Sequence, residues 1–224
     1  MFLPEIDAEH LPPELRDEPP RYNIAPTQSI HCVYRESTSQ VRTTEKFRWG
    51  LIPSWGKDLA IGNRMINARS ETLDTKPSFR KAFATRRCLI PSDGYYEWRK
   101  VSDGKQPYLI EPKSGLFAMA GLWEENTKLA IDGDPIRTTT IITTEANETT
   151  SDVHHRMPVL LDESNFEVWL DPSFRDLDAL KNLLVPAPND RLKLTAVSRH
   201  VNRASNDDPA CVEPAPTQST LDFE

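Results

Sequence analysis

Most of the chain between Ser29 and Ala146 consists of short segments that alternate β-branched or aromatic residues with polar ones. Such alternation is typical of strands with one buried face, because successive side chains on a strand point to opposite sides. Turn-forming stretches separate the segments, as in SDGK and PKSG. We expect strands at 29–35, 41–49, 87–91, 94–100, 107–111, 115–123, 137–146 and 192–198.

Helical periodicity is weaker and falls outside these segments. Short amphipathic stretches are found at 76–84, 162–171 and 174–185. Strands in runs, with helices between them and no regular alternation of strand and helix, favour an α+β fold. We therefore predict a curved, barrel-like and mainly antiparallel β-sheet with a few flanking helices.

The two ends of the chain differ in composition from the middle. Residues 1–20 are rich in proline and acidic residues, which excludes a long helix there. Residues 214–224 have too little apolar content to pack against a core. We predict an extended lead-in at 1–20, a single domain at 21–213 and a disordered tail at 214–224.

The formal net charge of −7 conceals an uneven distribution. Residues 35–113 carry 16 Lys and Arg against 9 Asp and Glu, whereas residues 1–34 carry 2 against 6 and residues 114–224 carry 9 against 19. Binding to phosphates follows the local potential within a Debye length of about 10 Å, so an acidic protein with a basic face can still bind nucleic acid. The alternative, that these charges only solvate the segment, stays open at this point.

Membrane insertion and disulfide bonding are both disfavoured. No apolar run approaches the roughly 18 residues of a membrane span, and no basic region precedes an apolar stretch at the N-terminus. Cys32, Cys88 and Cys211 are odd in number and widely spaced, which argues against a disulfide framework. We expect a cytoplasmic protein, with Cys32 and Cys88 buried in strands.

Four short segments combine a titratable or amide side chain with neighbours that restrict the backbone. They are Arg21–Gln28, Met65–Thr72, Pro91–Trp98 and Val153–Pro158. Each is weak when taken singly, because Asn67 could be a turn residue, Glu97 a surface carboxylate and His154 a structural histidine.

Glu97 has the strongest case among these residues. Strand alternation places Tyr95 and Glu97 on one face, with Tyr96 and Trp98 on the other. Aromatic surroundings that exclude water would raise the pKa of the carboxyl. A carboxyl group of that kind can transfer protons near neutral pH.

The adjacent residues His154 and His155 allow a similar test. Neighbouring residues on a strand point to opposite faces and do not easily share one metal ion, so we expect no metal site here. One of the two imidazoles is expected to face a site, where it suits acid–base chemistry.

The order of the segments resembles one known family. In chain order they read RYNIAPTQ, FRWGLIPSW, MINARSET, RRCLIPSDGYYEW, HHRMPVLL and AVSRHVNRASNDDPACVEP, and they follow one another as in the SRAP family of SOS-response-associated peptidase-like proteins, which process abasic sites in DNA. The resemblance covers about Arg21 to Pro214. It implies a monomeric enzyme without a cofactor that binds single-stranded DNA containing abasic sites, associates with the nucleoid when bound to DNA, and has DNA-protein crosslinking, self-processing peptidase (hydrolase) and lyase activities.

The resemblance also implies a chemistry for three residues. In that family a cysteine, exposed by removal of the initiator methionine, forms a Schiff base and then a thiazolidine with the ring-opened abasic sugar. Asn67 would position the reacting sugar or amine, Glu97 would handle protons, and His154 would assist ring opening and crosslink reversal. We expect these three side chains to meet in one positively lined pocket.

Contacts to the DNA around the lesion are implied in the same way. Arg69 and Arg156 would bind phosphates, with which guanidinium groups make bidentate contacts. Further residues would shape the site or stack on unpaired bases, each base worth roughly 1 to 3 kcal/mol. These residues are Asn23, Pro26, Trp49, Trp55 and Trp98. Burial in the core is the alternative for each tryptophan.

The N-terminus departs from the family pattern. The family begins Met-Cys-Gly-Arg, whereas this chain begins Met-Phe-Leu-Pro, so that Phe2 stands where the nucleophile is expected. None of the three cysteines has a free α-amine beside its thiol, and none can close a thiazolidine. Either the native protein carries a further N-terminal segment, which we favour because the other candidate catalytic residues are present, or the chain is a variant without covalent capture.

Two rival functions stay open. One is a non-covalent sensor of single-stranded or damaged DNA that uses Arg69 and Arg156 without turnover. The other is a peptidase that acts on other proteins, for which the sequence offers no Ser/His/Asp arrangement and no zinc motif.

Overall fold

The computed structural model describes residues 18–36, 39 and 41–216. Most of the predicted lead-in, including Phe2, and residues 217–224 of the predicted tail lie outside the described residues. The chain is still attached beyond the expected boundary at 213, since Pro214 pairs with Val197 and the amide of Ala215 donates to the carbonyl of Ala196 over 2.8 Å.

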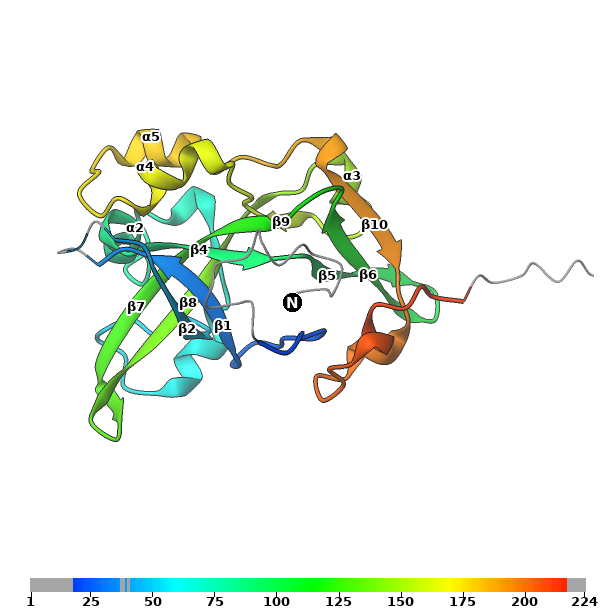
Figure 1. The fold of residues 1–224 in the computed structure, drawn as a ribbon, viewed down its shortest axis with the longest axis horizontal. Coiled ribbons are helices and arrows are strands. Elements are labelled where there is room, and N and C mark those ends of the chain that lie inside the picture. Colours follow the sequence, from blue (N-terminus) through cyan, green and yellow to red (C-terminus); the bar gives the residue numbers. More distant parts are fainter. Residues whose placement is uncertain (1–17, 37–38, 40, 217–224) are drawn as a thin grey trace, which may run out of the picture.

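The strands of the described chain form two sheets (Figure 1). The larger sheet contains β1 (Ser29–Tyr34), β2 (Thr43–Trp49), β3 (Asn67–Arg69), β4 (Arg87–Ser92), β7 (Phe117–Ile131), β8 (Asp134–Glu145) and β9 (Arg156–Pro158). The smaller, antiparallel sheet contains β5 (Tyr95–Val101), β6 (Gly104–Pro112) and β10 (Leu192–Ala196).

Helices are short and lie between the strands. The α-helices are α2 (Arg80–Thr85), α3 (Glu148–Ser151), α4 (Phe166–Leu170) and α5 (Leu177–Asn182). Short 3-10 helices occur at η2 (Leu59–Arg64), η3 (Ser70–Thr72), η4 (Glu163–Asn165), η5 (Asn189–Arg191), η6 (Arg199–Asn202) and η7 (Pro209–Cys211). The three predicted helices correspond to α2, α4 and α5, each shorter than expected.

The larger sheet closes on itself as a barrel. Strands pair antiparallel in the order β2-β1-β4-β7-β8, and β8 then pairs with β2 in parallel, where Arg48 meets Thr138 and Trp49 meets Thr139. The predicted barrel-like, mainly antiparallel sheet is confirmed. The parallel closure was not predicted, because nothing in either segment identifies a partner so distant in sequence.

Two three-residue strands missed in the sequence extend the pairing of β8. β3 lies parallel to β8, with Asn67 opposite Ile141, and β9 lies antiparallel to it, with Pro158 opposite Thr143. Segments this short carry no readable alternation. They matter because they bring the Asn67 and Arg156 segments to the same strand.

The β7–β8 hairpin also runs further than the sequence indicated. Its turn is Asp132-Gly133, with φ of 52° and 94° at the two positions. Positive φ at both central residues is the type I′ geometry that matches the twist of a hairpin, and Asp-Gly is a preferred pair for it.

Apolar side chains fill the barrel and the layer beneath the helices. Inside the barrel the rings of Tyr34, Phe47 and Trp123 contact one another with centroids 5.0 to 5.6 Å apart. Outside it, Phe83 of α2 and Trp169 of α4 join a second buried cluster. The α2, α4 and α5 helices lie together over one part of the barrel, at the upper left of Figure 1, and the smaller sheet lies to the right of the barrel.

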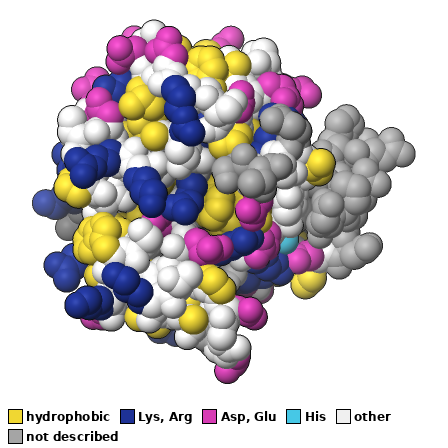
Figure 2. Space-filling view, turned by 90° about the vertical axis from the view of Figure 1, so that its left-hand side faces the viewer, with side chains coloured by type: hydrophobic (Ala, Val, Ile, Leu, Met, Phe, Trp, Pro, Cys, Tyr) yellow, Lys and Arg dark blue, Asp and Glu magenta, His cyan; other side chains and the backbone are white. Residues whose placement is uncertain are grey.

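The three cysteines are free and buried, as predicted for Cys32 and Cys88. None of the helices in the described part of the chain has the length and apolar character that crossing a bilayer requires. Lys and Arg side chains gather across the middle of the face formed on the helical side of the molecule, with acidic side chains along its upper edge (Figure 2).

Arg87 joins β4 to the helices through its guanidinium group. It is 2% exposed and donates only to backbone carbonyls. The acceptors are those of Phe83, Ala84, Trp169, Asp171 and Phe174. Burial, with a smaller contribution from Arg175, lowers the pKa of Arg87 to about 10.

We predict that Arg87→Lys destabilises the fold by about 3 kcal/mol, because an ammonium group cannot reach carbonyls spread around a planar fork and buried acceptors are left unpaired. Urea unfolding measures the loss. Arg80→Lys, at an exposed position of α2, serves as the control and should change stability by less than about 0.5 kcal/mol. Equal effects of the two substitutions would contradict this assignment.

Candidate functional site

A cavity of about 440 Å³ lies between the barrel and the smaller sheet. Its walls come from the segment before β1, from β1, β2, β3, β4, β7, β8 and β9 of the larger sheet, from β5, and from the chain around η6. Most of these residues are apolar or aromatic, and Asn67 and Glu97 are among the few polar ones. Convergent polar groups in a mainly apolar cavity are the usual character of a ligand site.

The part of the cavity wall that precedes β1 is fixed by hydrogen bonds to the chain that follows η6. The carboxylate of Asp207 accepts from the amides of Tyr22 and Asn23, at 2.6 and 2.9 Å, and from the guanidinium of Arg21. The Asn23 side-chain amide in turn donates to the carbonyls of Val201, Arg203 and Asn206. Asn23 therefore shapes the cavity by fixing its wall, and its amide nitrogen is already engaged.

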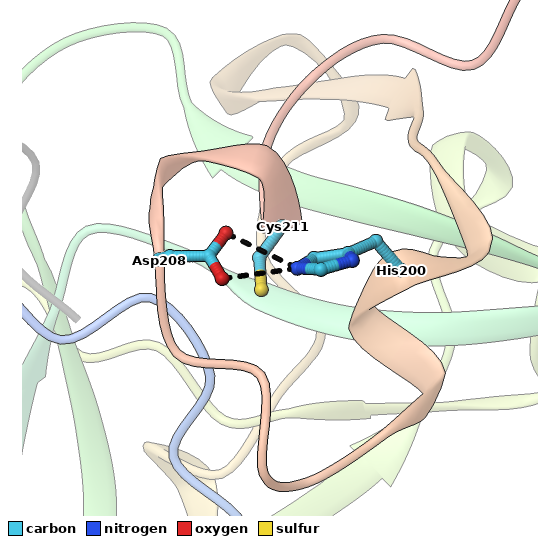
Figure 3. Close-up of side chains that lie close together, drawn as sticks. All are labelled: His200, Asp208 and Cys211. Carbon is cyan, nitrogen blue, oxygen red and sulfur yellow. Dashed lines mark hydrogen bonds and ion pairs between the residues drawn. The ribbon is translucent and has the colours of Figure 1, made fainter.

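Three side chains nearby have the donor types that bind zinc. A ring nitrogen of His200, the Asp208 carboxylate and the Cys211 thiol lie within 4.8 Å of one another (Figure 3). However, the Asn206 amide nitrogen donates to Nδ1 of His200 over 3.1 Å and to the His200 carbonyl over 2.8 Å. Nδ1 must then be an acceptor, so the proton is on Nε2, which donates to Asp208. Both ring nitrogens of His200 are thus engaged by neighbouring side chains, and these contacts hold the wall of the cavity together between η6 and η7.

The side chains of β5 point alternately toward the barrel and toward the chain around Tyr22 and η6. The ring of Tyr95 packs against Phe117 with centroids 6.0 Å apart. On the other face, Tyr96 Oη donates to the carbonyl of Tyr22 over 2.8 Å, and Trp98 Nε1 donates to Asn202 Oδ1 over 2.7 Å. The predicted alternation of β5 is confirmed.

Glu97 and His154 form the polar pair of the site. Nδ1 of His154 lies 3.5 Å from Oε1 of Glu97 and 3.0 Å from the carbonyl oxygen of Arg156. Burial raises the pKa of Glu97, against the opposing effects of His154, the Trp98 amide and Lys105. The Glu97 side chain is 26% exposed and that of His154 is 37% exposed, so both remain reachable from solvent.

Asn67 completes the group that the sequence singled out. It belongs to β3, is exposed, and lines the same cavity as Glu97. The register of β3 on β8 fixes its position, because Asn67 lies opposite Ile141, another residue of the cavity wall. The structure thus brings Asn67, Glu97 and, through its contact with Glu97, His154 to one place.

Arg69 and Arg156 lie beside the cavity and not in its wall. Arg69 shares the exposed face of β3 with Asn67. Arg156 of β9 donates to the carbonyl of Thr143, a residue of the wall, over 2.6 Å. Among the described residues that line the cavity there is no lysine or arginine, so the expectation of a positively lined pocket was wrong. Of the basic residues of the middle segment, Arg87 is buried, and the others are exposed or partly exposed at positions outside the cavity wall.

The aromatic candidates divide into two groups. Pro26, Trp49 and Trp98 line the cavity. The indole nitrogen of Trp49 donates to the Ile66 carbonyl over 2.8 Å, which holds that ring in place. Trp55 is not part of the cavity wall and is 52% exposed.

The expectation that His154 and His155 point to opposite faces was wrong. Both residues precede β9, so strand alternation does not apply, and their ring centroids are 4.5 Å apart. His31 is a further cavity residue that sequence reasoning passed over. Its Nε2 lies 3.0 Å from Glu18, which also pairs with Lys46 at 2.6 Å. The alternation of β1 could have indicated His31, since it places that side chain opposite the buried Cys32.

The arrangement is suited to proton transfer next to a bound polar group. A carboxyl with a raised pKa and a neighbouring imidazole can exchange a proton, and an amide beside them can orient a hydroxyl or an amine. Among the described residues that line the cavity, Glu97 is the one acidic residue and His31 the one histidine.

Comparison with known proteins gives one consistent result. A model of the family described as SOS response associated peptidase (SRAP) matches residues 5–204. The chain is 46% identical over 197 residues to the abasic site processing protein YoqW of Bacillus subtilis, covering 87% of this chain and 86% of the relative. It is 33% identical over 227 residues to the abasic site processing protein HMCES of Gallus gallus, covering 87% of this chain and 66% of the relative.

A solved structure agrees with the sequence relatives. A protein from Bacteroides thetaiotaomicron superimposes with a TM-score of 0.75 at 31% identity, covering 85% of this chain and 82% of that one. The extent of the family match and the identity to the relatives leave one conclusion: this chain belongs to the SRAP family.

Proposed function

We propose that this protein binds single-stranded DNA at abasic sites and acts on the base-free sugar in the cavity between the barrel and the smaller sheet. The observation that carries the proposal is the Glu97–His154 pair, 3.5 Å apart, with Glu97 and Asn67 both lining one mainly apolar cavity. The names of YoqW and HMCES, which describe abasic site processing, support the same substrate.

The chemistry assigned to the pair is proton transfer during imine formation. An amine that adds to the aldehyde of a ring-opened sugar forms a carbinolamine, and loss of water from it requires a proton on the departing hydroxyl. Glu97 is suited to supply that proton because its raised pKa keeps more of the carboxyl protonated near neutral pH. His154 exchanges the proton with Glu97, and Asn67 orients the sugar. Self-processing peptidase and lyase activities would draw on the same pair.

Binding to the DNA backbone is assigned to Arg69 and Arg156. Guanidinium groups beside the cavity would hold the phosphates on either side of the lesion while the apolar walls accept the sugar. Trp98, at the edge of the cavity, offers a ring on which an unpaired base can stack. The protein would need no partner subunit for this and would act as a monomer.

The burial and chain positions of the three cysteines favour a second function, non-covalent sensing of abasic sites. Cys32, Cys88 and Cys211 are buried, and their α-amines are part of peptide bonds. A thiazolidine needs a free amine and a thiol on the same residue. None of these three cysteines can therefore close a thiazolidine, whereas non-covalent binding of an abasic site needs no such group.

Of the predictions that follow from this proposal, the first separates the two functions. The 224-residue chain and a version extended by a Met-Cys-Gly-Arg start are incubated with single-stranded DNA that contains an abasic site, followed by denaturing electrophoresis. We expect a stable adduct from the extended version alone, with similar non-covalent binding by both. Binding by both without an adduct from either would instead support the sensor.

A second prediction concerns Glu97. In the extended version, Glu97→Gln should slow Schiff-base and crosslink formation by about 100-fold or more, the usual contribution of a general acid. Borohydride trapping measures the Schiff base. Glu163→Gln, at an exposed position remote from the cavity wall, should leave the rate unchanged. If Glu97→Gln retained the original rate, Glu97 would have no acid–base role.

The same substitution should alter the pH dependence of stability. Because the pKa of Glu97 is raised in the folded state from an ordinary value of 4.5, the unfolded chain loses this proton first as the pH rises, and the folded state loses stability until its own pKa is passed. Glu97→Gln removes this cost. Urea unfolding should therefore show the variant gaining stability relative to the wild type between pH 4 and pH 7, and a constant difference would contradict the raised pKa.

A fourth prediction tests the contact to the backbone. Arg156→Ala should weaken binding to single-stranded DNA of any sequence and reduce the slope of log K against log salt by about one unit. Arg191→Ala, at an exposed arginine that pairs with Asp162, is the control and should leave the slope unchanged. An unchanged slope for Arg156→Ala would remove this residue from the phosphate contacts.

A further inference from the structure

Arg156 is already bound by an anionic group of the protein itself. Its Nη1 and Nη2 donate to the two carboxylate oxygens of Glu71 at 2.5 and 3.0 Å. This is the bidentate geometry with which arginine also binds phosphate. The Arg156 side chain is 15% exposed, whereas that of Glu71 is 49% exposed, so the carboxylate lies on the solvent side of the guanidinium.

The Glu71 carboxylate is close to both arginines that the proposed function assigns to the DNA backbone. Hydrogen bonding to Arg156 makes the largest contribution to lowering the pKa of Glu71, and the charge of Arg69 adds to it. Arg69 and Glu71 are two residues apart, at the junction of β3 and η3, and Arg69 lies opposite Thr143, whose carbonyl accepts from Arg156. A negatively charged group is therefore bound to Arg156 and is within the electrostatic influence of Arg69.

The guanidinium of Arg156 has not used all of its donors. Its Nε is buried and has no hydrogen-bond partner among the described residues. A buried donor without a partner is uncommon in folded proteins. Arg156 is thus anchored on Thr143 and on Glu71 but retains a donor for another acceptor.

We infer that Glu71 is a built-in competitor for DNA phosphate, which must leave Arg156 before the backbone can bind there. The inference rests on the proposed function, because it needs Arg156 to contact DNA. When a phosphate replaces the Glu71 carboxylate, Arg156 loses one bidentate contact and gains another. The free energy lost with the Glu71 contact therefore offsets much of the free energy gained from the phosphate. Glu71 can move to solvent without breaking a core contact, because half of its side chain is already exposed.

The test compares Glu71→Gln with the wild type by fluorescence anisotropy, using a labelled single-stranded oligonucleotide with and without an abasic site at one salt concentration. Loss of the competing charge should tighten binding to both oligonucleotides by roughly three- to tenfold, the range expected for a partly exposed bidentate ion pair. Glutamine keeps the size of the side chain, and thermal unfolding verifies that the fold is unaffected.

The matched control is Glu145→Gln. Glu145 is exposed and lies directly opposite Arg156 in the β8–β9 pairing, so it reports the general effect of removing one negative charge near the same arginine. We expect less than a twofold change from it. In the Arg156→Ala background, Glu71→Gln should also change affinity by less than twofold, because the competition needs the arginine.

The outcomes are distinguishable. Equal or weaker binding by Glu71→Gln, with wild-type binding intact and sensitive to Arg156→Ala, overturns the competitor role alone and makes Glu71 a residue that positions Arg156. A gain from Glu145→Gln as large as that from Glu71→Gln also overturns it. If the wild type does not bind either oligonucleotide, the proposed function fails and the competitor role fails with it.

Discussion

The parallel pairing of β8 with β2 is the constraint on which the rest of the structure depends. It closes the barrel, and it leaves the remainder of β8 free to pair with β3 on one side and β9 on the other. The two residues of β8 that pair with β2 are buried threonines with satisfied hydroxyls, because Thr138 accepts from the amide of Ile52 over 2.9 Å and Thr139 donates to the Leu122 carbonyl over 3.0 Å. The strand that closes the barrel therefore also places Asn67 and Arg156.

The site combines two opposite uses of charge. In the cavity, the Glu97 carboxyl is partly buried, and burial raises its pKa although His154 lies 3.5 Å away and opposes the change. Beside the cavity, Glu71 makes a bidentate contact with Arg156 and its pKa is lowered. The first carboxylate is suited to exchange a proton and the second to remain an anion. Separate environments let one small region perform both tasks.

The wall opposite the barrel depends on contacts between distant parts of the chain. The backbone amide of Asn23 donates to Asp207, and its side-chain amide donates to the carbonyl of Asn206. A hydrogen bond between His200 and Asp208 closes the loop that follows η6. Buried polar groups of this kind need partners, and they find them only when both segments are in place. The cavity is thus completed by the same contacts that attach the two ends of the described chain to the fold.

The sequence by itself determined the strands, the helical segments, the alternation of β5 and the resemblance that singled out Asn67, Glu97 and His154, because these follow from local periodicity and short motifs. It did not indicate β3, β9 or the parallel closure, since three residues carry no period and pairing partners are chosen by the whole sheet. Nor did it show that Arg156 is held by Glu71 or that His154 contacts His155. Distances between side chains are set by tertiary packing, so only the folded structure decided which charges face the cavity and which neutralise one another beside it.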